Sequence, residues 1–247
     1  MYASLKSLLH KILPQKSLFK HELFLRSFYA MFFIGNNYQC NICLKKLRSF
    51  KKVGEDKLCP SCGSLPRNRR LWDILNKSYL KDSMTVLDFS PSRNLYRVLK
   101  KKNIIYTASD LSGHFISDVK YDITNISSAD NCYDLIICYH ILEHVINDIK
   151  AMDELLRVLK PNGTCIIQTP FKDGGIYEDY SITNDDQRKI HFGQEDHVRW
   201  YSVQGLKDRL EKTGFEVNTL VFSEAQTNFN GFDEEETILV CNKPSNA

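Results

Sequence analysis

The sequence of 247 residues has no uninterrupted apolar run as long as the ~18–20 residues that a membrane-spanning helix requires. The nearest candidate, residues 23–34, is interrupted by Arg26. This region does not match a secretory signal either, because the basic, half-polar stretch before it is too long and no small-x-small cleavage site follows. We therefore expect a cytoplasmic protein without a transmembrane segment.

Glycine is absent from the position where nucleotide-binding turns usually carry it. Residues 84–89 (MTVLDF) form a short apolar run that predicts a buried strand, and residues 91–101 predict the helix that follows. The turn between them, Phe89-Ser90-Pro91, contains no glycine, which a dinucleotide-binding turn needs to bring its backbone close to a pyrophosphate. The segment therefore binds either no ligand or a ligand without a pyrophosphate.

The eight cysteines do not form the pattern of a disulfide framework. Four of them lie in two pairs, Cys40 with Cys43 and Cys59 with Cys62, and the other four are scattered through apolar stretches. The C-x2-C-x15-C-x2-C spacing matches the zinc-ribbon template, in which four thiolates surround one tetrahedral ion. Gly63 permits the tight turn after the second pair. We expect a structural Zn²⁺ here, with four unrelated thiols as the alternative.

Charge is distributed unevenly along the chain. Residues 1–82 carry 16 Lys and Arg against 5 Asp and Glu, a net charge of +11, whereas residues 83–247 carry 17 against 25, a net charge of −8. Parts of opposite sign suggest two modules with different partners. The cluster of Arg67, Arg69 and Arg70 could contact phosphate, but such a cluster more often forms a solvated face or pairs with acidic groups of the neighbouring domain.

The first 36 residues predict two helices separated near Pro14, each with an apolar stripe and a basic polar side. The stripes consist of Leu5, Leu8, Leu9 and Ile12 in the first helix and of Phe24, Phe28, Met31 and Phe32 in the second. Such a segment either lies on a membrane surface or packs on the body of the protein, and the packed arrangement is the commoner one.

From residue 84 onward, predicted strands alternate with predicted helices, which indicates an α/β fold with a mainly parallel sheet covered on both faces. The strands are expected at 84–89, 104–109, 118–121, 134–139, 163–169, 215–222 and 236–241, and the helices at 91–101, 147–160 and 202–213. The last two strands follow one another without a helix, which predicts an antiparallel hairpin. The expected segments are 1–37 (basic amphipathic helices), 38–66 (zinc-ribbon-like module), 67–82 (connecting helix) and 83–247 (main domain).

Acidic residues follow the predicted strands at the edge where such sheets bind ligands. Asp110 ends the second strand, roughly 20 residues after Asp88, where a carboxylate can accept both ribose hydroxyls of a nucleoside. Asp122 follows the third strand, and Tyr139 and His140 end the fourth.

Taken in order, VLDFSP, SDL, DIT, YDLIICYHILEHV, RVLKPNG and TCIIQTP resemble the motifs of the class I S-adenosylmethionine-dependent methyltransferases, specifically the type 11 group. The resemblance covers residues 84–222 and is specific as a set. HFGQEDHVRWYS, within residues 171–202, resembles a motif of a subgroup that also has an N-terminal four-cysteine, zinc-ribbon-like module. The resemblance implies a Rossmann-like, seven-stranded, mainly parallel sheet with an antiparallel last strand.

The resemblance also implies which residues contact the cofactor S-adenosylmethionine. They are Asp88, Phe89, Ser90, Pro91, Asp110, Leu111, Asp122, Ile123 and Tyr139. Most of the family has a glycine-rich loop where this chain has FSPSRN, but S-adenosylmethionine has no phosphate and needs only room for its methionine part. A degenerate domain that binds no cofactor is the alternative.

Residues 171–202 form a long polar segment at the ligand-binding edge of the sheet, so we expect a functional role for it. An oxygen nucleophile gains from a general base within hydrogen-bond reach. The candidates are His197, Asp196 and His191 in this segment, with His140 and His144 after the fourth strand as rivals. For each histidine taken alone, a structural imidazole is the commoner role.

Three functions remain open. The first is an S-adenosylmethionine-dependent methyltransferase that O-methylates a small molecule or a glycan precursor. The second is an RNA methyltransferase whose basic zinc module binds the acceptor, although the module has few aromatic residues for base stacking and YHILEH is not the Asn/Asp-Pro-Pro-aromatic motif. The third is a non-catalytic binding protein. We favour the first, with peripheral membrane contact through residues 1–36 left open.

Overall fold

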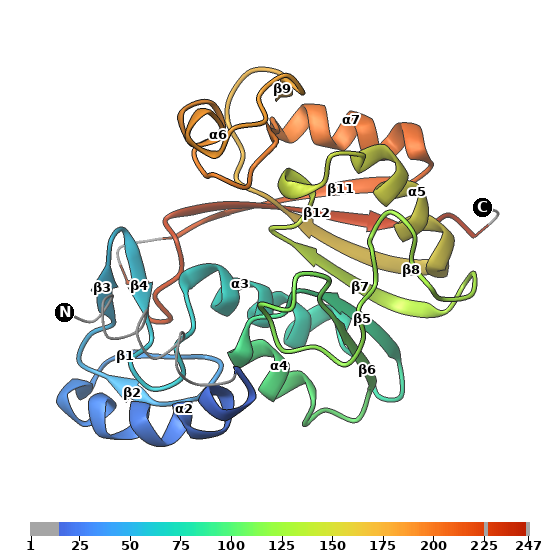
Figure 1. Cartoon of the computed structure of the whole chain (residues 1–247). Coiled ribbons are helices and arrows are strands. Elements are labelled where there is room, and N and C mark those ends of the chain that lie inside the picture. Colours follow the sequence, from blue (N-terminus) through green and yellow to red (C-terminus); the bar gives the residue numbers. More distant parts are fainter. Residues whose placement is uncertain (1–14, 225–226, 246–247) are drawn as a thin grey trace.

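The computed structural model describes residues 15–224 and 227–245, which surround a sheet of six strands in the order β11-β12-β8-β7-β5-β6 (Figure 1). The strands are β5 (Thr85–Phe89), β6 (Ile105–Ser109), β7 (Tyr133–Tyr139), β8 (Leu159–Gln168), β11 (Glu216–Ser223) and β12 (Glu235–Asn242). Neighbours from β6 to β8 are parallel, whereas β12 is antiparallel to both β8 and β11. The predicted α/β sheet with an antiparallel last strand is therefore confirmed.

The strand expected over residues 118–121 does not form, so this sheet has six strands in place of seven. One parallel bridge, between Ser109 and Val119, continues the sheet beyond β6. The carboxylate of Asp118 explains the difference, because it accepts a hydrogen bond from the backbone amide of Ala108 at 3.0 Å. A side chain thereby takes the backbone donor that a neighbouring strand would use.

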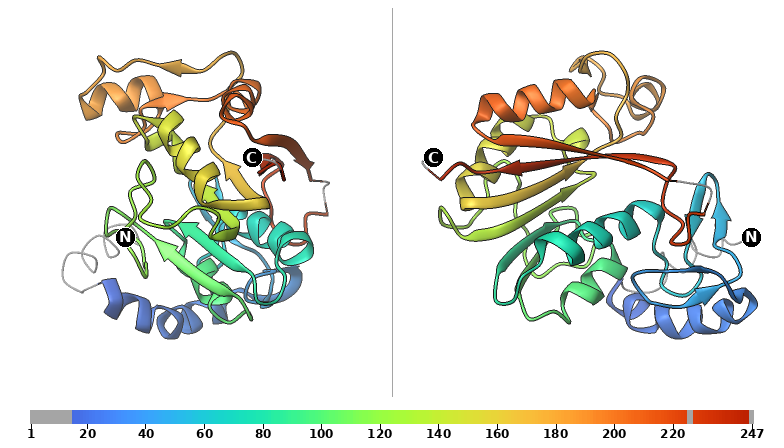
Figure 2. Two further views of the ribbon diagram at one scale, coloured as in Figure 1. Left: turned by 90° about the vertical axis from the view of Figure 1, so that its right-hand side faces the viewer. Right: turned by 180° about the vertical axis from the view of Figure 1, so that it is seen from behind.

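Helices cover both faces of the sheet, as the alternation of elements predicts. One face carries α5 (Asp148–Val158) and α7 (Val203–Thr213), and the other carries α3 (Pro66–Ile74) and α4 (Arg93–Leu99), each pair packed in its own apolar core. The view from behind shows the two pairs above and below the sheet (Figure 2).

Two helix ends show how local sequence sets the boundaries. α7 ends at Gly214, whose φ of 114° provides the left-handed C-cap that glycine adopts most easily. α5 ends at Val158, two residues earlier than expected, and β8 begins at once with Leu159. Pro161 accounts for this, because the residue before a proline is driven toward extended backbone.

A small N-terminal module precedes the sheet. It contains α2 (Gln15–Ala30), the short 3-10 helix Met31–Phe33 and two small antiparallel sheets. These pair β1 (Ile34–Gln39) with β2 (Lys46–Leu47) and β3 (Lys51–Val53) with β4 (Asp56–Leu58). The loop between β11 and β12 reaches back to this module, where the Gln39 amide donates to the Phe229 carbonyl oxygen at 2.9 Å.

The apolar stripe expected on α2 faces outward. Phe24, Phe28, Met31 and Phe32 are 64%, 55%, 64% and 71% exposed. The helix does pack on the body, but through other residues: the ring of Phe19 contacts Tyr96, and Arg97 donates to the Phe19 carbonyl oxygen at 2.8 Å. The other expected helix, with Leu5, Leu8, Leu9 and Ile12, lies outside the described residues. Within the described part of the chain, no helix has both the length and the apolar character that a membrane span requires.

Residues 171–202 form a separate layer beside the carboxyl end of β8 (Figure 1). This segment contains β9 (Tyr177–Glu178), α6 (Asp185–Phe192) and β10 (Arg199–Trp200), with β9 antiparallel to β10. The amide of Val198 donates to the carbonyl oxygen of Glu143 at 2.9 Å, which ties the segment to the short 3-10 helix Leu142–His144 after β7.

Candidate functional site

The four cysteines of the N-terminal module meet in one cluster, with all Sγ atoms within 4.8 Å of one another. The Sγ atoms of Cys40 and Cys62 lie 3.7 Å apart, and those of Cys43 and Cys59 lie 3.8 Å apart. Four sulfurs at the usual Zn–S distance of about 2.3 Å in a tetrahedron would be separated by about 3.8 Å. The cluster therefore fits a tetrahedral zinc ion with little rearrangement.

Matching backbone turns hold the two cysteine pairs. The amide of Leu44 donates to the carbonyl oxygen of Cys40, and the amide of Gly63 donates to that of Cys59. Leu44 and Gly63 have φ angles of 59° and 76°. Gly63 therefore has the role expected from the sequence, whereas Leu44 adopts the same conformation without being glycine. Hydrogen bonds from the neighbouring thiols, that of Cys43 first, lower the pKa of Cys40, whereas hydrogen bonds with Cys40 raise the pKa of Cys59 and of Cys62. Cys40 is thus the member that most readily becomes a thiolate, which is the form that binds metal.

Two of the three arginines after the cysteines are buried, whereas Arg67 is partly exposed. Arg69 is fully buried and donates to four carbonyl oxygens, those of Lys57, Ser64, Asn230 and Gly231. Arg70 is 4% exposed and pairs with Glu224 and Glu236. Pairing with acidic groups of the neighbouring domain is thus the correct interpretation for Arg70, and neither Arg69 nor Arg70 is available to an external phosphate.

The glycine-free turn after β5 adopts a glycine-like backbone. Ser90 has a φ of 47°, in a region that costs a non-glycine residue on the order of 1–3 kcal/mol. Two hydrogen bonds offset this cost, from the Ser90 amide to Ser109 at 2.7 Å and from the Ser90 hydroxyl to Asp110 at 2.9 Å. The Asp110 carboxylate also accepts from the hydroxyl of Ser112 at 3.0 Å and from the amide of Phe115 at 3.1 Å. A ribose bound to Asp110 would replace the two serine hydroxyls.

Asp88 lies within the sheet, only 2% exposed. Its carboxylate accepts a hydrogen bond from the hydroxyl of Tyr106 at 2.8 Å. Burial raises the pKa of Asp88 to about 7, and the bond from Tyr106 offsets part of that effect. Phe89 and Pro91, which flank the turn, are buried as well.

Of the remaining predicted cofactor residues, Leu111 and Tyr139 lie at the ends of β6 and β7, whereas Asp122 and Ile123 lie in the connection between these strands. Leu111 is 60% exposed beyond β6, and Ile123 is buried in the core. The Asp122 carboxylate is exposed and caps its own turn. The hydroxyl of Tyr139, at the end of β7, donates to Glu236 at 2.6 Å.

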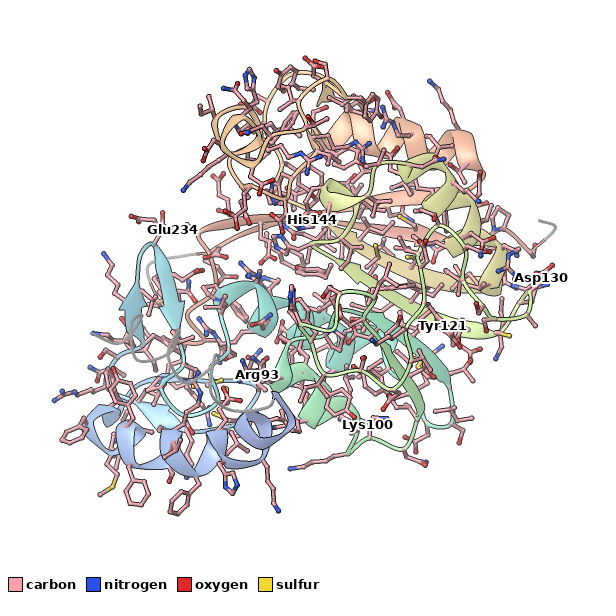
Figure 3. The ribbon with its side chains drawn as sticks, viewed as in Figure 1. Arg93, Lys100, Tyr121, Asp130, His144 and Glu234 are labelled. Atoms are coloured by element: carbon pink, nitrogen blue, oxygen red, sulfur yellow. The ribbon has the colours of Figure 1, made fainter. Side chains whose placement is uncertain are left out.

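Most of the predicted catalytic residues meet beyond β7. Ligand atoms of Glu143, His144 and His197 lie within 4.8 Å of one another. The Nδ1 atom of His144 lies 3.3 Å from the Asp196 carboxylate, and that of His140 lies 3.2 Å from Glu143. Figure 3 shows His144 between the sheet and the segment that carries α6. The sequence did not lead us to predict a role for Glu143, and the one feature that could have indicated it is its position between His140 and His144.

His191 takes a different position. It is exposed on α6, and its Nδ1 lies 2.9 Å from the hydroxyl of Tyr177. His197, by contrast, is 1% exposed, and burial together with the neighbouring His144 lowers its pKa. His197 is therefore neutral at neutral pH and has a lone pair to share.

Arg199, a residue that sequence reasoning also missed, fixes this arrangement. Its buried guanidinium pairs with Glu178 at 2.9 Å and donates to the carbonyl oxygens of Leu142 and Ile146 at 3.1 Å and 2.8 Å. These bonds hold residues 171–202 against the segment after β7. They thereby position His197, two residues before Arg199, beside Glu143.

A cavity of about 280 Å³ adjoins His140 at the carboxyl ends of β7 and β8, and Arg67 also lines it. Its lining includes His140, Gln168 and Glu236. Burial raises the pKa of Glu236 to about 7. Buried oxygens of Gln168 and Glu236 have no hydrogen-bond partner within the described residues. The cavity can therefore bind a polar ligand.

A family model described as a methyltransferase domain matches residues 66–220. The chain belongs to this methyltransferase family. The matched region runs from α3 to β11 and includes the turn after β5, Asp110, the histidine cluster and residues 171–202.

Two curated relatives share part of the methyltransferase domain. An uncharacterized protein of Methanocaldococcus jannaschii is 33% identical over 142 residues, which cover 54% of this chain and 60% of the relative. The sterol 24-C-methyltransferase of Eremothecium gossypii is 30% identical over 129 residues, which cover 51% of this chain and 33% of that enzyme. The matches therefore span less than two thirds of either relative.

Solved structures share the fold. Phosphoethanolamine N-methyltransferase 2 of Haemonchus contortus, in complex with S-adenosyl-L-methionine, has a TM-score of 0.51 and 13% identity. The alignment covers 72% of this chain and 52% of that one. At this identity the likeness concerns the fold alone.

Proposed function

We propose that the chain is an S-adenosylmethionine-dependent methyltransferase that O-methylates a small molecule or a glycan precursor. Family membership supports methyl transfer, and the relative whose fold it shares binds S-adenosyl-L-methionine. The observation that carries the proposal is topological. Asp110, the turn at Ser90 and His140 follow the adjacent parallel strands β6, β5 and β7, so all three lie at one edge of the sheet.

In this proposal Asp110 holds the ribose of the cofactor, and the other predicted contacts surround its adenosine and methionine parts. When bound, S-adenosylmethionine would supply a methyl group from a cationic sulfur, which leaves as the neutral thioether. The role left to this chain would be to take the proton of the acceptor hydroxyl with a base. His140 is the candidate base that lines the cavity. The other candidates nearby, His144, His197 and Asp196, do not line it.

The four-cysteine cluster is proposed as a structural Zn²⁺ site. Its module would correspond to the N-terminal zinc-ribbon-like module of the methyltransferase subgroup that the sequence resembles. The Sγ separations of 3.7 Å and 3.8 Å support this proposal. Purified protein should contain about one zinc ion per chain at this site. A folded, metal-free protein would refute it. The division into residues 1–37, 38–66, 67–82 and 83–247 stays a prediction.

The RNA methyltransferase is the weaker alternative. Its main support is the basic N-terminal part, but Arg69 and Arg70 are engaged inside the protein. Steep salt-dependent retention on RNA would favour this alternative, because phosphate contacts release counterions.

Calorimetric titration with S-adenosylmethionine tests the proposal, paired with methyl labelling of a cell extract separated into RNA, protein, glycan or lipid, and small-molecule fractions. We expect saturable binding that Asp110→Ala abolishes and Ser90→Ala only weakens, because Ser90 acts through Asp110. Label is expected in the glycan or small-molecule fraction. Failure of the unaltered protein to bind the cofactor would favour a non-catalytic binding protein.

A further inference from the structure

Glu143 is a buried carboxylate with no hydrogen bond to either oxygen from the described residues. It is 1% exposed, and its nearest polar neighbours are Nδ1 of His140 at 3.2 Å and Nε2 of His144 at 3.9 Å. Removing a carboxylate from water without such bonds is costly. A cation at this position would compensate the cost.

Two imidazoles present lone pairs toward this carboxylate. Nδ1 of His144 lies 3.2 Å from the carbonyl oxygen of Asp196, and Nδ1 of His197 lies 3.2 Å from that of Phe192. A carbonyl oxygen only accepts hydrogen bonds, so each proton is assigned to Nδ1 and each Nε2 is left as an acceptor. Histidines that bind metals almost always have such a partner on the second nitrogen.

We propose that Glu143, His144 and His197 form a binding site for a first-row divalent cation, distinct from the four-cysteine cluster. Their ligand atoms already lie within 4.8 Å of one another. Two imidazole nitrogens and one carboxylate oxygen form a donor set that suits Zn²⁺, Fe²⁺ and Mn²⁺. With three protein ligands, the cation keeps positions open for exogenous ligands.

Of the residues around the cluster, His140 lines the cavity at the carboxyl ends of β7 and β8, so the open positions would be reached from that side. Glu143 and His197 are buried on the far side of the cluster, whereas the side chains of His144 and His140 are 32% and 26% exposed. If the proposed function holds, an oxygen of the methyl acceptor would bind there. The cation would also join residues 171–202, through His197, to the segment after β7.

Titration with Mn²⁺ alone tests the site in the full chain loaded with a single Zn²⁺ per chain, which the four thiolates take, so that the proposed site is empty at the start. Free Mn²⁺ is followed by its paramagnetic resonance signal. Mn²⁺ prefers oxygen and nitrogen ligands over thiolates, so it leaves the cysteine cluster to zinc. We expect one saturable site per chain. Glu143→Gln should weaken binding on the order of a hundredfold, because it removes the only charged ligand while keeping the side-chain volume. Glu195→Gln is the matched control, because it neutralises an exposed carboxylate two residues before His197. This variant should bind Mn²⁺ as the unaltered chain does.

Thermal unfolding provides a second readout. Mn²⁺ should raise the melting temperature of the unaltered chain and of Glu195→Gln, but not that of Glu143→Gln. Should Glu143→Gln fail to fold, His144→Gln, altered at a partly exposed position, provides the same comparison. Absence of saturable Mn²⁺ binding, or an equal loss in Glu195→Gln, would overturn the site.

Calorimetry with S-adenosylmethionine in the absence of Mn²⁺ separates the two proposals. Manganese binding without cofactor binding would leave the metal site standing and remove the proposed function. Cofactor binding without a manganese site would do the reverse.

Discussion

Single residues at the edge of the sheet carry polar groups that the packing has removed from water. Ser90 keeps a left-handed backbone through its bond to Asp110, and Asp88 keeps a buried carboxylate through its bond from Tyr106. Neither arrangement is the most stable choice for its position. Such local conflicts between stability and chemistry are typical of functional sites.

The buried carboxylate of Asp88 makes stability depend on pH. Its pKa rises from an ordinary 3.8 to about 7 in the folded chain, so the folded state binds the proton more tightly than the unfolded state. The stability that this proton confers is complete below pH 4 and is lost as the pH rises toward 7. At about 1.4 kcal/mol per pH unit, the loss is on the order of 4 kcal/mol.

Asp88→Asn should therefore flatten the rise in unfolding free energy between pH 7 and pH 4, measured by urea denaturation at several pH values. Part of the slope should remain, because Glu236 also has a pKa raised to about 7. Asp153→Asn, at an exposed position, controls for the loss of one carboxylate. Identical slopes in Asp88→Asn and the unaltered chain would refute the assignment.

At the scale of elements, two buried arginines join segments that are distant in sequence. Arg69 of α3 connects the cysteine module to the loop between β11 and β12, and Arg199 connects residues 171–202 to the segment after β7. A guanidinium has five donors in a fixed geometry, so one side chain can satisfy several carbonyl oxygens at once.

Arg69→Ala should lower the unfolding free energy by about 3–5 kcal/mol, because it leaves several buried carbonyl oxygens without a donor. Arg69→Lys should recover only part of this loss, since an ammonium group has fewer donors. Arg48→Ala, at an exposed position in the same module, should change stability by no more than about 0.5 kcal/mol. Denaturation in the presence of zinc gives the comparison, and equal effects of Arg69→Ala and Arg48→Ala would contradict it.

At the scale of the whole molecule, α2 and the short 3-10 helix after it expose a group of large apolar side chains. Phe24 and Phe28 stack edge to face at 5.0 Å on the outside of the helix, with Met31 and Phe32 beside them in sequence. Lys20 is exposed on the same helix. Aromatic residues next to a basic side chain are characteristic of helices that lie on a membrane surface. The outward stripe therefore supports the peripheral membrane contact that the sequence left open.

The double variant Phe24→Ser, Phe28→Ser should reduce co-sedimentation with phosphatidylcholine vesicles that contain an anionic lipid. Each phenylalanine is worth roughly 1.5 kcal/mol or more when buried, so binding should weaken on the order of a hundredfold. Stability should hardly change, because both side chains are exposed. Val221→Ser, on exposed β11, is the control. Equal sedimentation of the double variant and the unaltered chain would exclude this surface.

The sequence by itself determined the features that depend on local order. The spacing of Cys40, Cys43, Cys59 and Cys62 predicted the cluster that the structure contains, because two short turns suffice to bring each pair together. Alternating strands and helices predicted the parallel sheet, and the lack of a helix between the last two strands predicted their antiparallel hairpin.

Only the tertiary structure decided what each side chain faces. The spacing predicted that Phe24 and Phe28 share one side of a helix, but it did not predict whether that side faces inward. The sequence likewise left open whether Arg69 contacts an external phosphate, and the structure shows that it is buried. Glu143 and His197 are far apart in the chain and meet because tertiary contacts, those of Arg199 among them, dock residues 171–202 beside β7. Burial, and with it the cost of an unpartnered charge, is set by packing between elements, which no local pattern records.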